Sequence, residues 1–289
     1  MPYIASVLLA VAALAIAAPA AELAPDAAAL AATMRGHRVV LLGEVHDNAA
    51  QHALRAAALR ELLVEGARPA LAFEQFDRAR QADIDRARRE RPADPDYLIA
   101  QSKGSDDWQW QYYRPYVALA LEYGLPIIAA NLSRGDAMRV AVDGWSALFD
   151  PATRRQLRLD ALPARFVQQH EDAIAAGHCN MLERAALPAL AHAQMARDIT
   201  MATAIRPYID RGVVLLSGNG HVRRDVGVPF WLTARERTSA ISIGLLERGD
   251  TVLDAQPAPP FDAYVVTERA ERADPCKGLE QRMRPGMAR

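Results

Sequence analysis

The chain has 289 residues and a formal net charge of -1 at pH 7. This balance gives no general attraction for nucleic acid or anionic lipid, so no nucleic-acid partner is expected. The length fits one large domain or two small ones with a sizeable core.

The first twenty residues have the features of a secretory signal. They carry no charged side chain, are apolar from about Ile4 to Ala17 and end in Ala18-Pro19-Ala20. An apolar run of roughly 15 residues before a small-x-small sequence is typical of a cleaved signal. No Lys or Arg precedes the run, so an uncleaved N-terminal anchor or a misassigned start are the alternatives. We expect a signal peptide at residues 1–20, one α/β domain at residues 21–289, and export to the periplasm.

Short apolar runs with β character alternate with helical segments along the rest of the chain. The strands are expected at Val39–Leu42, Ala70–Phe73, Ile127–Ala130, Val213–Leu216, Ala240–Leu246 and Ala263–Val266. Helical periodicity is found at Ala49–Leu63, Arg78–Arg89, Tyr116–Tyr123 and about Ala189–Ile209. The alternation predicts an α/β fold, a mostly parallel sheet flanked by helices on both faces. The longer stretches 83–123 and 145–188 are predicted to be helical insertions over one sheet edge.

Polar side chains follow the first four of these runs directly. They are Glu44 and His46 after the first run, Glu74 after the second, Asn131 and Arg134 after the third, and His221 after the fourth. Ligands bind at the carboxyl edge of a parallel sheet, because the loops that leave it surround a crevice. The sequence therefore predicts one site built from Glu44, His46, Glu74 and His221. We expect substitutions there to affect function more than stability.

Each of these residues also has a purely structural interpretation. Glu44 and His46 could simply precede the cap of the next helix, and Glu74 could be a solvated turn residue. His221 could cap the turn that follows it. His52 lies within a predicted helix and is expected to be a surface or packing residue.

Two further residues share one face of a later helix. Gln194 and Asp198 are four positions apart, so their side chains lie on the same side. This spacing is equally consistent with an exposed face and with the wall of a pocket.

Two carboxylates and two imidazoles support more than one chemistry. They are suitable ligands for a divalent metal ion, with an open position for an activated water. They could also transfer protons without a metal, with a carboxylate pKa raised beside a histidine. The sequence has no HExxH helix, GxSxG elbow or P-loop that would decide between these readings.

The chain contains two cysteines, Cys179 and Cys276. An even number of cysteines in an exported protein favours a disulfide, and two separate buried thiols are the alternative. No CxxC or CxxCH sequence occurs, which argues against a cysteine metal site and against covalently attached haem.

Several motifs in this order resemble the ChaN-type haem-binding proteins. They are GEVHDN at 43–48 with His52, EQF at 74–76, WQWQYYRPYV at 108–117, IIAANLSR at 127–134, AQMARDITMA at 193–202, LLSGNGHVRRDVGVP at 215–229 and DPC at 274–276. The resemblance covers nearly all of the chain after the leader. It implies membership of a wider group that includes Tiki-type metalloproteases and erythromycin esterases.

The resemblance implies haem as the cofactor and a role in haem or iron uptake. A tyrosine is then the expected iron ligand, and Tyr112, Tyr113 and Tyr116 all lie in the matching segment. Haem propionates could pair with Arg134, Arg197 or Arg223. Membrane-associated uptake machinery and a second copy in a homodimer are the partners to consider. ChaN proteins are often lipid-anchored, whereas no cysteine near this leader could carry a lipid.

Two functions follow from these observations. The first is a periplasmic haem-binding protein for haem or iron uptake. The alternative is a hydrolase, metal-dependent or Glu/His-based, that uses Glu44, His46, Glu74 and His221 in the same cleft. A binding module for another small anionic ligand is a third, less specific reading.

Overall fold

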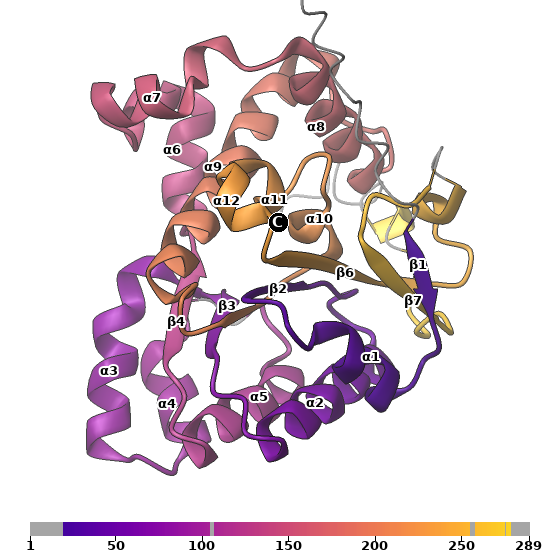
Figure 1. Cartoon of the computed structure of the whole chain (residues 1–289). Helices are drawn as coiled ribbons and strands as arrows, with labels where there is room; N and C mark the ends of the chain where they lie inside the picture. Colours follow the sequence, from indigo (N-terminus) through magenta and orange to yellow (C-terminus); the bar gives the residue numbers. More distant parts are fainter. Residues whose placement is uncertain (1–19, 105–106, 255–257, 275, 279–289) are drawn as a thin grey trace, which may run out of the picture.

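A parallel sheet forms the centre of the computed structural model, which describes residues 20–104, 107–254, 258–274 and 276–278. Within these residues the strand order is β1-β7-β6-β2-β5-β3-β4, and every pairing is parallel (Figure 1). The strands are β1 Ala21–Leu23, β2 Val39–Leu42, β3 Ala70–Asp77, β4 Ile127–Asn131, β5 Val213–Leu216, β6 Ala240–Glu247 and β7 Ala263–Thr267. The signal peptide expected at residues 1–20 lies outside the described residues except for Ala20.

The predicted α/β class and its six strands are confirmed. The central strands β2 and β5 read VVLL and are buried throughout, as expected for strands covered on both faces. Strand β3 continues beyond the predicted end at Phe73, through Glu74, to Asp77. Strand β1 was not predicted, because three residues with a mixed exposure pattern carry no periodic signal.

One face of the sheet is covered by the helices of the first half of the chain. They are α1 Ala27–Met34, α2 Ala49–Val64, α3 Gln81–Glu90, α4 Pro95–Ser102 and α5 Trp110–Glu122, with a 3-10 turn at Arg78–Arg80. Figure 1 shows them together below the sheet. Leu59, Leu63, Phe73, Tyr113 and Tyr116 are fully buried in the core between these helices and the strands.

The other face is covered by the later helices, above the sheet in Figure 1. They are α6 Arg134–Asp143, α7 Pro151–Leu157, α8 Ala164–Gly177, α9 Leu187–Ile205, α10 Asn219–Val222, α11 Val228–Trp231 and α12 Ala234–Arg237. Short 3-10 turns lie at Trp145–Ala147, Leu159–Ala161, Arg184–Ala186, Arg206–Tyr208 and Thr251–Asp254. The long helix α9 is the centre of this layer and packs against α6, α8 and α11.

Both long insertions are helical, as predicted, but they lie on opposite faces of the sheet. Residues from the first, such as Ile84 and Leu98, belong to the core below the sheet. Residues from the second, such as Leu159 and Phe166, belong to the core above it. The sequence did not assign the insertions to faces, because helical periodicity does not show which face of the sheet a helix covers.

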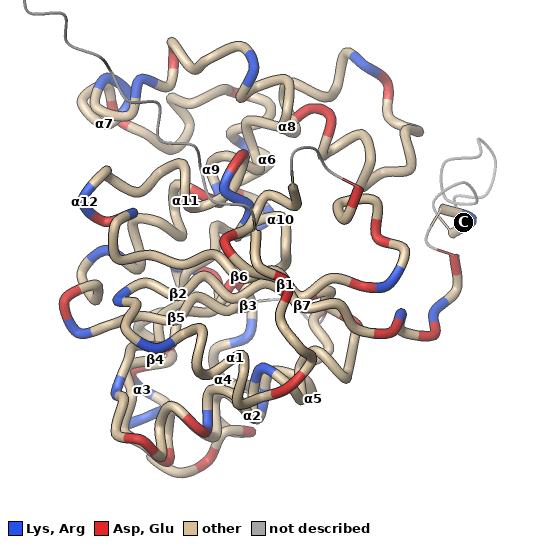
Figure 2. The backbone as a smooth tube through the Cα atoms, turned by 45° about the vertical axis from the view of Figure 1, so that its right-hand side comes forward, with Lys and Arg blue, Asp and Glu red and all other residues tan. Residues whose placement is uncertain are grey.

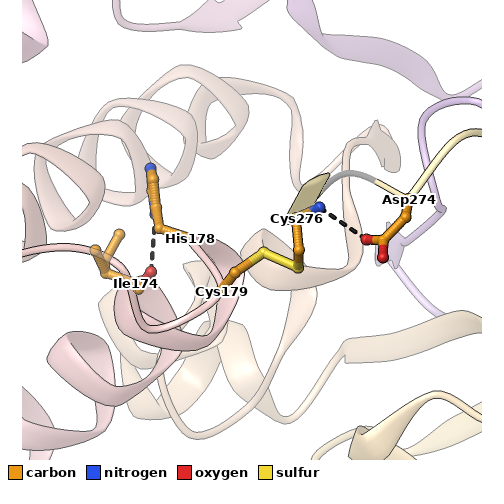
Figure 3. Close-up of a disulfide and its surroundings, with 5 residues drawn as sticks. All are labelled: Ile174, His178, Cys179, Asp274 and Cys276. Carbon is orange, nitrogen blue, oxygen red and sulfur yellow. Dashed lines mark hydrogen bonds between the residues drawn. A yellow bond between two sulfur atoms is a disulfide. The ribbon is translucent and has the colours of Figure 1, made fainter. Parts of the chain in front are cut away.

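The predicted disulfide between Cys179 and Cys276 is confirmed, with a Cα–Cα distance of 5.7 Å. Figure 3 shows it joining the turn after α8 to the segment near Asp274. His178, beside the first cysteine, turns back onto the carbonyl of Ile174 at 2.8 Å.

Charged residues are interspersed along the chain. Figure 2 shows basic and acidic segments close to one another over both helical layers, in keeping with the net charge of -1. Among the described helices, none has both the length and the apolar character that crossing a bilayer requires.

Candidate functional site

The predicted residues come together where three adjacent strands end. Strand β2 leads into the loop with Glu44 and His46, β3 carries Glu74, and β5 leads into the short helix α10 with His221. A Cβ atom added to Gly218 would lie 2.7 Å from His46 Cε1 and 3.7 Å from Glu74 Oε2. Glycine at this position therefore lets the β2 loop approach the end of β5 closely.

Glu44 is the centre of a buried cluster on one side of this edge. Its Oε1 accepts a hydrogen bond from the Tyr113 hydroxyl at 2.6 Å and contacts His46 Nδ1 at 3.0 Å. Its Oε2 forms an ion pair with Arg55 and lies 3.3 Å from His52 Nδ1. The side chains of Glu44 and Arg55 are both fully buried, so each neutralises a charge that would be costly alone.

His46 is the exposed member of this cluster. Its side chain is 48% exposed, and its ring meets Trp108 edge-on with centroids 5.0 Å apart. An ionised carboxylate only accepts hydrogen bonds, so Nδ1 must be the nitrogen that donates to Glu44. In the neutral ring the lone pair then lies on Nε2. Nε2 lies on the side of Gly218, where an added Cβ atom would come within 3.0 Å of it.

His52 packs behind His46, in agreement with the surface-or-packing prediction. Its Nε2 donates to the carbonyl of His46 at 3.0 Å, and its ring stacks on Tyr112 with centroids 4.8 Å apart. Burial lowers the pKa of His52 to about 4, so the ring is neutral at pH 7. Its contact with the His46 carbonyl helps to fix the loop.

His221 lies between two carboxylates on the other side of the edge. Its Nδ1 is 2.6 Å from Asp198 Oδ1, and its Nε2 is 3.3 Å from Glu74 Oε1. Burial lowers the pKa of His221, but the two negative charges outweigh burial and raise the pKa to about 10. Burial likewise raises the pKa of Glu74, and the charge of His221 outweighs it and lowers the pKa to about 2. At pH 7 the group is an imidazolium held by two carboxylates.

The partners of His221 on α9 include a residue whose role the sequence left open. Gln194 and Asp198 both face His221, and the Gln194 amide lies 3.2 Å from its Nε2. Their shared helical face is not exposed, because Asp198 is buried against His221. Glu74 is fixed in turn by the amide of Gly218, which donates to Oε2 at 2.7 Å.

The three candidate tyrosines differ in their environment. Tyr113 and Tyr116 are fully buried, and their hydroxyls donate to Glu44 and to the carbonyl of His52. Burial raises the pKa of both phenols, which opposes ionisation. Tyr112 is only half-buried, with its ring stacked on His52.

The candidate arginines are placed differently from one another. Arg197 donates to Asn131 Oδ1 at 2.9 Å, and Arg223 is paired with Asp225 at 2.7 Å. Arg134 is exposed at the start of α6, directly after β4. Of these three candidates, Arg134 is the one that is exposed.

The structure does not support the metal-ion reading of the four residues. Within the described part of the chain, no three His, Cys, Asp or Glu side chains are grouped so as to hold a metal ion. The physical reason lies in their partners. Glu44 is already paired with Arg55, and the two ring nitrogens of His221 already face Asp198 and Glu74.

Comparison with known proteins supplies the family. A model of the family described as "Haem-binding uptake, Tiki superfamily, ChaN" matches residues 30–232. The chain belongs to this family. Strands β6 and β7 lie beyond the matched residues of this ChaN-family chain. No curated protein matches it in sequence.

A solved structure of a ChaN protein agrees with this assignment at the level of the fold. ChaN of Campylobacter jejuni, in a structure described as showing cofacial haem binding, is 21% identical with a TM-score of 0.59. The match covers 75% of this chain and 84% of that one. A mutant of the erythromycin esterase EreC in its open conformation is 15% identical with a TM-score of 0.41. That match covers 79% of this chain and 75% of the esterase chain.

Every residue of the site lies inside the segment matched by the ChaN family. Two of its important members, Arg55 and Asp198, were not predicted as site residues. A signal for Asp198 was present in its spacing from Gln194, whereas Arg55 lies in a helix with no feature that marks it. The assembled site has one half-exposed histidine beside aromatic rings, with two buried charged clusters behind it.

Proposed function

We propose that this ChaN-family protein binds haem in the periplasm and takes part in haem or iron uptake. Haem binds at the surface formed by His46, Trp108 and Tyr112. The observation that carries the proposal is the state of His46, whose Nδ1 is fixed by Glu44 and whose ring is half-exposed. Haem iron accepts a phenolate oxygen or an imidazole nitrogen as axial ligand, and both groups are present here.

The residues around His46 fit a flat, largely apolar ligand. Trp108 and Tyr112 are half-buried, so each presents part of an aromatic ring to the ligand. Apolar contact of this kind contributes about 25 cal/mol per Å² removed from water. The hydrogen bond from Nδ1 to Glu44 orients the His46 ring and increases the basicity of Nε2.

Among the tyrosines, we propose Tyr112 as the iron ligand. Tyr113 and Tyr116 would have to break buried hydrogen bonds and ionise against a raised pKa. The exposed Arg134 is the proposed partner of a propionate, because the other candidate arginines already have partners.

Titration of the purified protein with hemin tests this proposal. We expect a saturable shift of the Soret band, and Tyr112→Phe should weaken hemin affinity by about 10²-fold or more, since it removes an anionic ligand. Tyr113→Phe and Tyr116→Phe are matched controls that should retain the wild-type spectrum. A Soret shift that is unchanged in Tyr112→Phe and lost in Tyr113→Phe would show that the ligand is wrongly assigned.

One observation favours hydrolysis as a second candidate function. A half-exposed histidine whose Nδ1 is held by a carboxylate has the arrangement of a general base with its orienting group. Hydrolysis of a chromogenic ester that is abolished by His46→Gln, in a protein that does not bind hemin, would favour this function. In that case Tyr112→Phe should leave turnover unchanged.

The predicted export agrees with the disulfide, because disulfides persist in oxidising compartments. Cell fractionation of the full chain, followed by N-terminal sequencing of the mature form, examines this part of the proposal.

A further inference from the structure

The segment after β7 returns to the loop that carries His46. From Glu268 to Asp274 the chain forms no helix or strand, and the disulfide at Cys276 follows. We call residues 268–274 and Cys276 the strap. The strap lies beyond residue 232, where the segment matched by the family ends.

Arg272 connects the strap to the residue that follows His46. Its Nε lies 2.7 Å from Asp47 Oδ2, and its Nη1 donates to Glu247 Oε2 at 2.8 Å. The side chain of Arg272 is 20% exposed and that of Glu247 is 8% exposed. Solvent therefore screens these ion pairs only in part. Without the guanidinium, two carboxylates would face each other with no positive charge between them.

Asn48 makes a second connection between the strap and the same loop. Its Nδ2 donates to Glu247 Oε1 at 2.8 Å and to the carbonyl of Glu268 at 3.0 Å. The amide of Ala270 donates to the same Glu247 oxygen at 3.0 Å. Asn48 also caps α2 through the amide of Gln51. The strap thus holds the loop and the start of α2 together.

The far end of the strap is joined to the helical layer that holds His221. Cys276 is bonded to Cys179, in the turn directly after α8 (Figure 3). Helix α8 packs against α9, and α9 carries Asp198, the partner of His221. The strap therefore spans from the His46 loop on one side of the site to the α8–α9 layer on the other.

We propose that the strap positions His46 for ligand binding, with Arg272 as the positioning residue and the disulfide as its far anchor. Arg272 touches no ligand and acts through Asp47 and Glu247. The choice of haem as the ligand rests on the function proposed above, whereas the ordering of the loop is a property of the unliganded protein.

Amide hydrogen exchange of the unliganded full chain tests the positioning directly. In Arg272→Gln we expect the amides of residues 44–48 to exchange roughly tenfold faster, because local opening becomes easier when the ion pairs are lost. Arg248→Gln is the matched control. It removes an exposed ion pair with the side chain of Glu268, at 2.9 Å, and leaves the Glu268 carbonyl bonded to Asn48. Exchange there should stay at the wild-type rate.

Hemin titration of the same variants gives the second measurement. Arg272→Gln should weaken hemin affinity by about five- to tenfold, the lower range of coupling between a distant group and a binding site, and Arg248→Gln should not. The double substitution Cys179→Ser and Cys276→Ser releases the far anchor and should change both measurements in the same direction. It serves as the test if Arg272→Gln does not fold.

Three results decide the matter. Unchanged exchange at residues 44–48 in both Arg272→Gln and the double cysteine variant overturns the proposal, whatever hemin does. Faster exchange with unchanged hemin affinity also overturns it, since the loop would then be ordered without effect on binding. Faster exchange in a protein whose wild-type form binds no hemin supports the strap and contradicts haem as the ligand.

Discussion

Glu44 and His46 are bonded to each other but differ in burial. The sequence led us to expect that substitutions of either would cost function rather than stability. The structure supports this only for His46, whose side chain is 48% exposed while that of Glu44 is fully buried against Arg55. Their roles therefore separate into a group that meets the ligand and a group that holds it in place.

Chemical unfolding of two variants distinguishes these roles. Glu44→Gln leaves Arg55 charged and unpaired in the core, so it should lower the free energy of unfolding by about 3–5 kcal/mol. His46→Gln removes a surface side chain and should change it by no more than about 0.5 kcal/mol. Equal losses for both variants would show that His46 is part of the core.

The polar residues at strand ends were accessible to prediction, but their buried partners were not. Glu44, Glu74 and His221 follow from the rule that loops at the carboxyl edge of a sheet carry the site. Arg55 is the counter-example. It lies on a helix whose other buried residues are mostly apolar, and its partner belongs to another element. Pairing across elements depends on packing angles that a single sequence does not specify.

At the scale of elements, strands were predictable because their apolar runs are short and continuous. The extension of β3 through Glu74 was not, since a charged residue usually ends such a run. In the structure Asp77 pairs with Asn131 of β4 after a register shift, which prolongs the strand. Glu74 therefore points into the site from a strand and not from a flexible turn.

The approach of the β2 loop to α10 yields a prediction with a matched control. In Gly218→Ala the added Cβ would lie 2.7 Å from His46 Cε1, so the half-exposed ring must move. In Gly220→Ala, two residues later and inside α10, the Cβ meets nothing within 4 Å. We expect roughly tenfold weaker hemin affinity in Gly218→Ala, because a binding group is displaced. Gly220→Ala should leave hemin affinity unchanged.

Backbone strain does not contribute to the expected effect of Gly218→Ala. Its φ is -65°, which alanine adopts without strain, so the effect of Gly218→Ala comes from the contact alone. Equal hemin affinity in the two alanine variants would mean that His46 does not contribute to binding in its observed position.

At the scale of the whole molecule, the site combines both helical layers. The partners of Glu44 come from α2 and α5 below the sheet, and the partner of His221 comes from α9 above it (Figure 1). The two clusters meet at the sheet edge, where His46 lies against Gly218 and Gly218 donates to Glu74. The relative position of the two layers therefore decides whether the site is assembled.

The disulfide is the covalent link that crosses from the C-terminal segment to the upper layer. The cysteines are 97 residues apart, and closing a loop of this length restricts the unfolded chain by about 4–5 kcal/mol in the chain-entropy description. Combined Cys179→Ser and Cys276→Ser substitution should lower the free energy of unfolding in urea by up to that amount, with the native contacts retained.

Single substitutions distinguish the effect of losing the disulfide bond from the effect of replacing each cysteine side chain. Cys179→Ser alone and Cys276→Ser alone each break the same bond, so each should lower the free energy of unfolding as much as the double variant does. Because the bond acts mainly on the unfolded chain, the slope of the unfolding transition should also rise as that chain becomes more expanded. A loss below about 1 kcal/mol, with an unchanged slope, would mean that strain in the folded state offsets most of the entropic gain.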